Sequence, residues 1–379
     1  MNKNQLLPYK SFINGTVPEL NGMRCYAVLL VLLHHIHSDS DIIMNWFKVY
    51  GWYGVNFFFT LSGFLITGLL LKEINQNSSI DLKAFWMRRI FRLWPAFYTC
   101  LFFGSLVILF VTTKRPEVRQ EFYETLFFYP LALANYLEIY IRKDGFPLVL
   151  NHFWSLAVEE HFYLLWPILF SQFYKRKVFF WLSTVVLLII PIYFRFLYIG
   201  SGETKIQIFK TLFSTETNID SMLYGCIAAL FYSRYNILKN ILLKNIFQIT
   251  SLALLIFTFH SLGPRENLGH LLTIEPILLS LASCLFILGA IENSNKLNNF
   301  FLKNRIALYI GKISYSLYLT HYILYTFNYG ILSKFHLTSI NSYFIGFIQI
   351  STSILASHFL FHYIESPFLK MRKKFTRVH

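Results

Sequence analysis

Long apolar runs recur from one end of this 379-residue chain to the other. A helix needs roughly 20 mainly apolar residues to cross the hydrocarbon core of a membrane. Segments of this kind lie at 23–38, 52–71, 93–113, 154–173, 178–198, 219–233, 246–262, 271–291, 308–329 and 341–363. Apolar runs of this length predict helices, because a helix satisfies its own backbone hydrogen bonds in lipid. The pattern therefore indicates an all-α polytopic membrane protein.

The composition supports the same class. Apolar residues make up 55% of the chain and charged residues only 14%, against about 25% charged in ordinary globular domains. A net charge of +15 could suit nucleic acid, but the basic residues lie in short clusters between the apolar runs, as they do when they orient membrane spans. We therefore expect no nucleic-acid partner.

Five basic clusters set the expected orientation of the spans. Their members are Lys72, Lys83, Arg88, Arg89 and Arg92; Lys175, Arg176 and Lys177; Arg234, Lys239 and Lys244; Lys296, Lys303 and Arg305; and Lys370, Arg372, Lys373, Lys374 and Arg377. With ten spans and the N-terminus inside, all five clusters fall on the cytoplasmic side, as the positive-inside rule requires. We thus predict about ten transmembrane helices with both termini cytoplasmic.

A weaker apolar segment, 123–141, contains Glu124, Pro130, Asn135 and Glu138. The ten-span count requires it to be a re-entrant or interfacial helix, which polar membrane-depth backbone allows where it lines a protein cavity. Against the rule, Lys114, Arg115, Arg119, Arg142 and Lys143 then lie outside.

The hydrophilic segments are too short to form a second domain. The longest, 72–92 and 199–218, cannot bury a core. We predict a single membrane domain over 1–379, with a basic cytoplasmic tail at 366–379. The first twenty residues lack the apolar core of a cleaved signal peptide. The four cysteines, at positions 25, 100, 226 and 284, lie inside apolar runs without metal-ligand spacing, so we expect neither a disulfide nor a metal site.

Polar residues inside spans are costly, and they are therefore functional candidates. Arg24 and His35 are eleven residues apart, so they share a helix face and are separated by roughly 16 Å. His34 points about 100° away from that face. A histidine in a helix can simply pack with hydrogen bonds, but near neutral pH it also suits a general base for a hydroxyl group.

Two further groups carry charge near or within spans. Arg88, Arg89 and Arg92 precede the third span; they could be a plain positive-inside anchor or a clamp for a phosphorylated cytosolic donor. Glu159 and Glu160 lie side by side in the fourth span, toward the outer half in this topology. A carboxylate that orients His35 is the expected partner. Ser62 has no base near it in sequence, so we do not expect a nucleophile there, and the nearby glycines are expected to allow close helix packing.

Six segments together resemble the acyltransferase 3 family of multi-span membrane enzymes. They are VPELNGMRCYAVLLVLLHH at 17–35, GVNFFFTLSGFLIT at 54–67, MRRIFRLWPAFY at 87–98, HFWSLAVEEHFYLLWP at 152–167, GKISYSLYLTH at 311–321 and HYIESPF at 362–368. The resemblance covers essentially the whole chain, with the segments in the family's order and spacing.

The resemblance implies transfer of an acyl group, usually acetyl, from cytosolic acetyl-CoA to a carbohydrate hydroxyl at the outer face. The family's arginine–histidine motif falls on Arg24 and His35, its RxxR motif on Arg89 and Arg92, and its glutamate on Glu159. It further implies a bacterial inner-membrane location and an acceptor such as O-antigen, capsule, exopolysaccharide or lipochitooligosaccharide.

This chain departs from the family pattern at three places. The first span reads Asn21-Gly22-Met23-Arg24-Cys25 where Asp-Gly-Leu-Arg-Gly is common. Asn56 stands where aspartate is usual, and His161 where glutamine is usual. The acids that are usual at positions 21 and 56 are therefore absent here, whereas the arginine and histidine of the first span are kept.

The residues and the resemblance together give one working hypothesis. Arg89 and Arg92, assisted by Arg88, hold the donor's phosphates, and His35 with Glu159 removes the hydroxyl proton or first accepts the acetyl group. Arg24, His34 and Glu160 complete the expected catalytic set. The rival interpretation is a transporter of a lipid-linked sugar or acyl donor, since buried Arg, His and Glu also line transport paths. No inverted repeat supports it.

Overall fold

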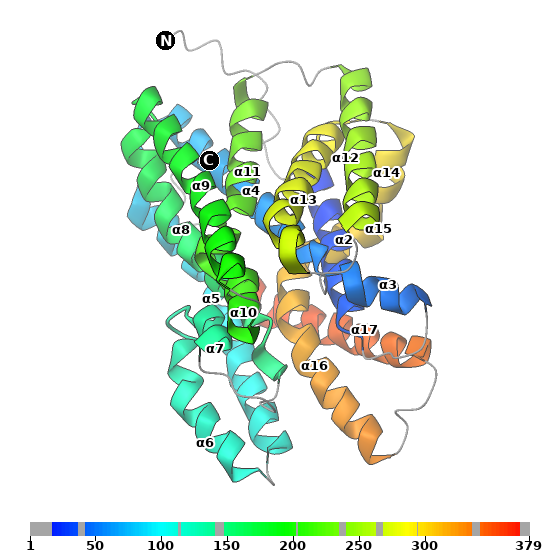
Figure 1. Ribbon diagram of the computed structural model, residues 1–379. Helices are drawn as coiled ribbons and strands as arrows, with labels where there is room; N and C mark the ends of the chain where they lie inside the picture. The colour runs from blue at the N-terminus through cyan, green and yellow to red at the C-terminus, as the bar shows by residue number, and fades with distance from the viewer. Residues whose placement is uncertain are drawn as a thin grey trace.

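The structure is a computed structural model, and it describes residues 17–36, 42–112, 115–140, 148–201, 204–234, 240–262, 268–293, 295–335 and 342–371. Within these ranges all regular structure is helical and no strand occurs (Figure 1). The all-α prediction is confirmed for this part of the chain. The single-domain prediction over 1–379 stays a prediction, and residues 372–379 of the predicted basic tail lie outside the described residues.

The helices follow one another along the chain with short connections. They are α2 (Pro18–His34), α3 (Ile42–Tyr50), α4 (Tyr53–Asn77), α5 (Leu82–Val111), α6 (Pro116–Thr125), η2 (Leu126–Phe128), α7 (Ala134–Tyr140), η3 (Leu148–Leu150), α8 (Phe153–Phe173), α9 (Lys177–Gly200), α10 (Lys205–Phe213), α11 (Thr215–Arg234), α12 (Ile241–Leu262), α13 (Leu268–Ala290), α14 (Lys296–Leu302), α15 (Arg305–Lys312), α16 (Ser314–Lys334), α17 (Ser342–Phe359), η5 (Leu360–Glu365) and α18 (Ser366–Met371).

Five helical segments of the described chain are long and apolar enough to cross a membrane: Ile42–Asn77, Leu82–Val111, Lys177–Gly200, Ile241–Ser261 and Tyr343–Met371. They coincide with half of the ten predicted spans. The other predicted spans are largely helical as well, in α2, α8, α11, α13 and α16. The helical membrane class is therefore confirmed, whereas the count of ten and the orientation stay predictions.

The span predicted at 308–329 is wrong in detail, because the helix breaks at Ile313 between α15 and α16. Close packing accompanies the break. A Cβ atom on Gly311 would lie only 1.8 Å from the backbone oxygen of Asn21, so α15 and α2 touch backbone to backbone here.

The weak segment 123–141 is not one helix. It runs through the end of α6, the single turn η2 and then α7, with Pro130 in the connection and Ala132 at a left-handed φ of 57°. Proline lacks the backbone N–H that a continuing helix needs. This broken course agrees with a segment that does not span, and its place relative to the membrane stays a prediction.

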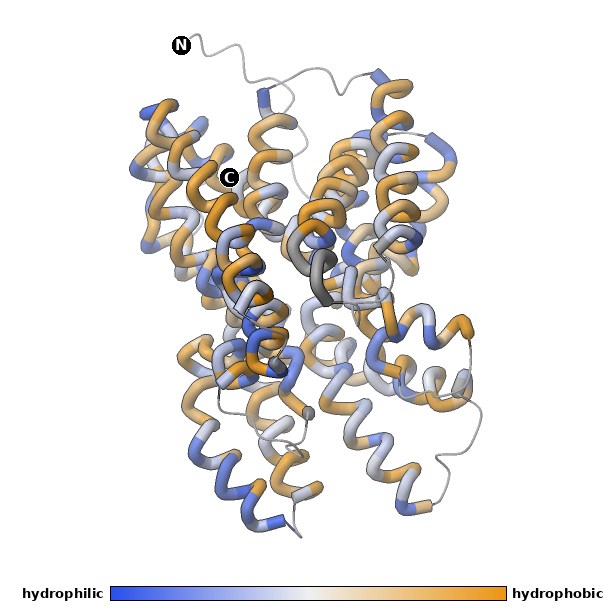
Figure 2. The backbone as a smooth tube through the Cα atoms, viewed as in Figure 1, coloured by the Kyte–Doolittle hydropathy of each residue, from blue (hydrophilic) through white to orange (hydrophobic). Residues whose placement is uncertain are grey.

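The outward surface of the bundle is strongly apolar. On α9 alone, Val178, Phe179, Leu182, Val186 and Phe196 are all more than half exposed. Figure 2 shows this hydrophobic colour along α9 and α12, with hydrophilic residues at the upper tips of α11 and α12 and along α6. A soluble monomer rarely exposes so large an apolar surface. The surface therefore fits helices that face lipid.

Glycines bring the central helices α4 and α11 into backbone contact. A Cβ atom on Gly63 would lie 1.8 Å from the Met222 oxygen, and one on Gly225 would lie 1.9 Å from the Thr60 oxygen. Small residues at such crossings let membrane helices pack closely. The predicted packing role of Gly63 is thus confirmed. These contacts fix the position of α4 against α11.

Candidate functional site

Three arginines and a glutamate line one cavity inside the bundle. Arg24 comes from α2, Arg89 and Arg92 from α5, and Glu159 from α8. Hydroxyl groups complete the polar lining, from Ser62, Ser155, Tyr163, Ser314, Tyr315 and Tyr318. We call this space the arginine cavity. Four residues singled out from three distant parts of the sequence therefore line one space.

The start of α5 determines which arginines face this cavity. Asp81 caps the helix by accepting a hydrogen bond from the Ala84 amide at 2.9 Å. Arg88 turns back and pairs with Glu73 on α4 at 2.7 Å, and Glu73 also accepts from the Asp81 amide. Arg88 therefore fastens the α4–α5 turn and does not line the cavity, unlike Arg89 and Arg92 three residues apart on the other face.

Arg89 lies over an aromatic ring at the cavity wall. Its guanidinium carbon is 5.2 Å from the ring centroid of Tyr163 and 5.6 Å from that of Phe85. Such cation–π contacts orient the guanidinium, whose planar donor edge matches carboxylate and phosphate oxygens. The arrangement can therefore receive an anion between Arg89, Arg92 and Arg24.

Glu159 is held by two hydroxyl donors. Ser62 donates at 2.8 Å and Tyr163 at 3.0 Å, and Arg24 and Arg89 interact with the same carboxylate electrostatically. Ser62, for which sequence showed no nearby base, is thus bonded to a carboxylate from another helix. The glutamate side chain is thus held in a fixed position among the arginines.

Glu160 lines a second hollow beside the first. Six of its lining residues are aromatic, among them Trp94 and Tyr98 of α5. Tyr315 borders both spaces and donates a 2.9 Å hydrogen bond to the Leu93 oxygen. Glu159 and Tyr315 thus line both spaces, whereas Glu160 lines only the second.

Four histidines gather near the C-terminal end of α2, and we call them the histidine cluster: His34, His35, His152 and His321. Nδ1 of His35 lies 3.3 Å from Nε2 of His321 on α16. The His35 ring centroid is 4.7 Å from that of His34, and the His152 centroid is 5.1 Å from that of His321. His152 and His321 are fully buried. Sequence reasoning assigned neither a role, although both end or begin motifs that carry the family resemblance.

The arginine cavity and the histidine cluster form two levels of the same bundle. Along α2, Arg24 and His35 are separated by roughly 16 Å, and along α8, His152 and Glu159 by about 10 Å. The described contacts thus connect Glu159 with Arg24, and His152 with His35. They do not show the predicted pairing of Glu159 with His35, because each lies at a different level.

Tyr318 joins the two levels. Its hydroxyl lies 2.6 Å from the Ser155 hydroxyl and donates to the backbone oxygen of His152 at 3.2 Å. Tyr318 and Ser155 also line the arginine cavity. Tyr318 therefore lies between the arginine cavity and the backbone of His152 in the histidine cluster.

An acid from the end of the chain also approaches Arg24. Glu365 closes the wide helical turn η5 just before Pro367, accepts a 2.8 Å hydrogen bond from Ser316 and interacts electrostatically with Arg24. Proline at 367 cannot continue the regular hydrogen-bond ladder, which accounts for the widened turn. Glu365 lies in the segment 362–368, which carries the family resemblance, but it was not among the predicted site residues.

The two departures from the family pattern in α4 and α8 lie away from the arginine cavity lining. Asn56 donates to Ser221 at 2.9 Å and contacts Ser280, whereas Nδ1 of His161 lies 2.6 Å from the Thr215 hydroxyl. Both residues therefore pack in polar networks between helices. Their change from the usual residue leaves the arginines and histidines untouched.

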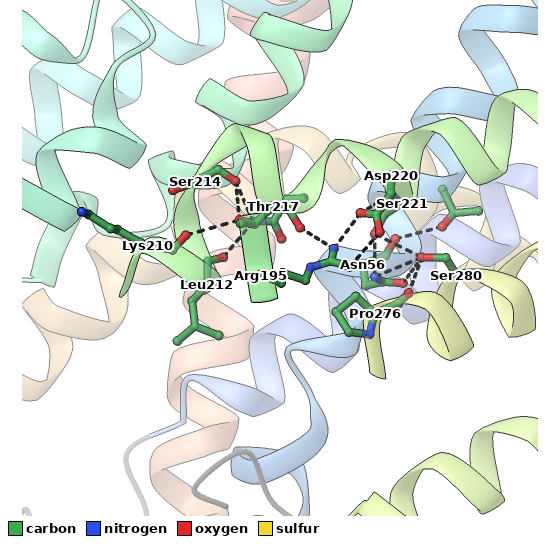
Figure 3. A network of polar contacts seen from close by, with 12 residues as sticks. Asn56, Arg195, Lys210, Leu212, Ser214, Thr217, Asp220, Ser221, Pro276 and Ser280 are labelled. Carbon is green, nitrogen blue, oxygen red and sulfur yellow. Dashed lines mark hydrogen bonds and ion pairs between the residues drawn. The ribbon is translucent and has the colours of Figure 1, made fainter. Parts of the chain in front are cut away.

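Figure 3 shows how Asn56 belongs to a larger buried network. Arg195 of α9 donates to both carboxylate oxygens of Asp220 on α11, at 2.8 and 2.7 Å, and also to the Thr217 backbone oxygen. Arg195 and Asp220 are each 1% exposed. Sequence reasoning missed this pair, whose bidentate geometry satisfies both charges and whose role is to join helices.

The remaining predicted features have simple structural positions. Cys25, Cys100, Cys226 and Cys284 are buried free thiols. Gly22, next to Arg24, lies against the backbone of Leu302. Within the described ranges no group of His, Cys, Asp and Glu has metal-site geometry.

Comparison with known proteins gives a family and several relatives. A family described as an acyltransferase domain matches residues 17–363. O-acetyltransferase OatA of Staphylococcus aureus (strain NCTC 8325 / PS 47) is 29% identical over 373 residues. A putative O-acetyltransferase of S. aureus (strain COL) is 29% identical over 371 residues. Each alignment covers 93% of this chain but 57% of the relative, so the chain spans little more than half their length. No solved structure matches.

Proposed function

The chain belongs to this acyltransferase family, and on that premise we propose that it transfers an acyl group, specifically acetyl, to a carbohydrate hydroxyl at the outer face of a membrane. The donor in this proposal is cytosolic acetyl-CoA. One observation carries it: the arginine cavity, suited to an anion, is joined through Tyr318 to the histidine cluster, suited to proton transfer.

The proposed topology places the donor and acceptor on opposite sides. We propose ten spans with both termini in the cytoplasm of a bacterial cell and the protein in its inner membrane. Arg89 and Arg92 then lie on the inner side and His34 and His35 toward the outer side. Positive charge concentrated on the cytoplasmic side supports this orientation.

The donor would bind through its phosphates. Arg89 and Arg92, with Arg24 across the cavity, offer guanidinium forks that match phosphate oxygens. Arg88 enters this proposal as support, since its pairing with Glu73 fixes the start of α5. In this proposal the thioester arm extends from this level past Tyr318 toward His35.

The chemical step needs one base. In this proposal His35 takes the proton of the acceptor hydroxyl as its oxygen attacks the thioester carbonyl. The new C–O bond forms, the C–S bond breaks, and the CoA thiolate leaves and regains the proton. His34 borders the base, Glu159 and Arg24 keep the donor end aligned, and Glu160 with its aromatic hollow is placed to contact the sugar.

The acceptor in this proposal is a polysaccharide of the cell envelope or its lipid-linked precursor. O-antigen, capsule, exopolysaccharide and lipochitooligosaccharide share the required hydroxyl chemistry. A lipid-linked form would reach the site from the surrounding membrane. The names of the relatives, O-acetyltransferases, support oxygen as the receiving atom.

Radiolabelled acetyl-CoA tests the proposal directly. Purified protein in lipid is incubated with label and each candidate acceptor, and acetylated product is separated and counted. We expect transfer by the wild type and its loss in His35→Ala, while His260→Ala, a change at an exposed histidine of α12, serves as the matched control. Uptake of labelled donor into vesicles without acetylated product would instead support a transporter.

A further inference from the structure

His321 lies within hydrogen-bond distance of His35, the proposed base. This contact determines which nitrogen of each ring carries a hydrogen. Its Nε2 is 3.3 Å from Nδ1 of His35, and its side chain is completely buried. The inference below rests on the proposed function for the role of His35. Its structural part, the proton arrangement, stands independently of any activity.

The proton on His321 is located by a backbone oxygen. Nδ1 of His321 lies 2.6 Å from the carbonyl oxygen of Tyr318. A carbonyl only accepts hydrogen bonds, so Nδ1 must carry the hydrogen. In the neutral ring, Nε2 of His321 then holds a lone pair directed at His35.

The proton on His35 is located in the same way. Nδ1 of His35 lies 2.9 Å from the carbonyl oxygen of Val31, and the same nitrogen faces the His321 lone pair. A hydrogen on Nδ1 satisfies both acceptors through a shared bond. The lone pair of the neutral His35 ring is therefore on Nε2.

The opposite placement of the hydrogens, on Nε2 of both rings, is unfavourable for both histidines. If His321 donated from Nε2 to His35 as a neutral ring, its own Nδ1 lone pair would face the Tyr318 oxygen. The Nδ1 lone pair of His35 would likewise face the Val31 oxygen. Buried acceptors without a donor are costly. Hydrogens on Nδ1 of both histidines are therefore the arrangement that satisfies the two carbonyl oxygens and the contact between the rings.

We propose that His321 is a positioning residue that keeps the His35 ring oriented with Nε2 as the basic nitrogen. The neighbouring rings hold His321 itself in place. His152 and Tyr325 pack against it with centroids 5.1 and 5.7 Å away, and Nε2 of His152 donates to the Leu319 oxygen at 3.1 Å. The histidine cluster thus supplies one reacting ring and an ordered support.

Substitution of His321 by glutamine and by asparagine distinguishes this positioning role from a simple packing role. In His321→Gln the amide oxygen reaches the position of Nε2 and can still accept from His35, whereas in His321→Asn it reaches only the position of Nδ1. His321→Leu removes both functions. We expect kcat for acetyl transfer to fall about tenfold or more in the Asn and Leu variants, with His321→Gln close to the wild type.

Donor KM and thermal stability provide the check on structure. A positioning role lowers kcat and leaves KM for acetyl-CoA unchanged, because the arginine cavity is at another level. Equal kcat in the Gln and Asn variants, each with a wild-type unfolding midpoint, would overturn the proposal. So would a fall confined to KM.

The tautomer itself can be read without activity. Protein labelled with ¹⁵N-histidine in lipid gives separate nitrogen shifts for protonated and unprotonated ring nitrogens, and a His35→Gln sample identifies the His35 signals. We expect His35 protonated at Nδ1 in the wild type at neutral pH and a mixture of tautomers in His321→Leu. A His35 ring protonated at Nε2 would refute the inference even if the enzyme transfers acetyl groups. Conversely, the expected tautomer in an inactive protein would leave the inference intact and reject the proposed function.

Discussion

Ser62 of α4 donates a 2.8 Å hydrogen bond to Glu159 of α8, although the two residues are 97 positions apart in the chain. The contact fixes one wall of the arginine cavity and explains why a serine without a nearby base in sequence still matters. It also places the carboxylate where Arg24 and Arg89 can interact with it.

Removing this donor is expected to weaken donor binding. Ser62→Ala leaves Glu159 with the Tyr163 hydroxyl alone, and a hydrogen bond to a charged group contributes about 1.5–3 kcal/mol. We predict a fall of about tenfold or more in kcat/KM for acetyl-CoA, and a larger one for Glu159→Gln. Ser79→Ala, a change at an exposed serine in the α4–α5 turn, is the control that should have no effect. Unchanged kinetics in Ser62→Ala would show that the contact is dispensable.

Substitutions of the neighbouring residues Arg88 and Arg89 are expected to have different effects. Arg89→Gln removes a cavity-lining guanidinium, so KM for acetyl-CoA should rise about tenfold or more with little loss of stability. Arg88→Gln breaks the pair with Glu73, so it should lower the unfolding temperature and leave KM unchanged. Steady-state kinetics and thermal unfolding in lipid distinguish the two. A rise in KM for Arg88→Gln alone would place the donor at the α4–α5 turn instead.

The buried ion pair of α9 and α11 is expected to matter for folding. Asp220→Asn leaves Arg195 charged and without its counter-ion, and breaking a buried pair costs about 3–5 kcal/mol. We predict a sharply lower yield of folded protein, partly recovered when Arg195→Met is added. Folded material of the double variant should keep its kcat, since neither residue lines the arginine cavity. The measurement is thermal unfolding combined with transfer activity per folded molecule.

The crossing of α4 and α11 makes a matched glycine test possible. Gly63→Ala would put a Cβ atom 1.8 Å from the Met222 oxygen, so the helices must separate. At Gly330 nothing lies within 4 Å of the added atom, and alanine there should be neutral or stabilising by about 0.5–1 kcal/mol. We predict loss of folding for the first variant and none for the second. Equal stability of the two variants would contradict the backbone contact.

Much of the helical architecture could be predicted because lipid imposes a simple length rule. Within the described residues that rule located the long apolar helices but missed the short α3, and it could not detect the break at Ile313, which accompanies tight packing of Gly311 against α2. Helix α10, inside a stretch treated as a connection, carries a local signal that was not used: Thr204 and Gln207 form a capping box.

The charged residues of the site could be predicted from the sequence. The side chains that they contact could not. Arg24, Arg89, Arg92 and Glu159 stand out in sequence because charge near lipid is costly, and they line one cavity. Which carboxylate meets which base depends on helix direction and level, and sequence spacing within one helix does not contain that information. His321 became visible only when α16 was placed behind α2, since a single buried histidine resembles a packing residue.

The central claim is that an acyl group taken from the inner side is delivered to an acceptor on the outer side. The most direct measurement uses vesicles whose cytoplasmic face points outward, with labelled acetyl-CoA added outside and an oligosaccharide acceptor enclosed inside. We predict acetylated oligosaccharide within the vesicles containing the wild type and none with His35→Ala. Acetylation only when the acceptor and acetyl-CoA are on the same side would contradict the claim.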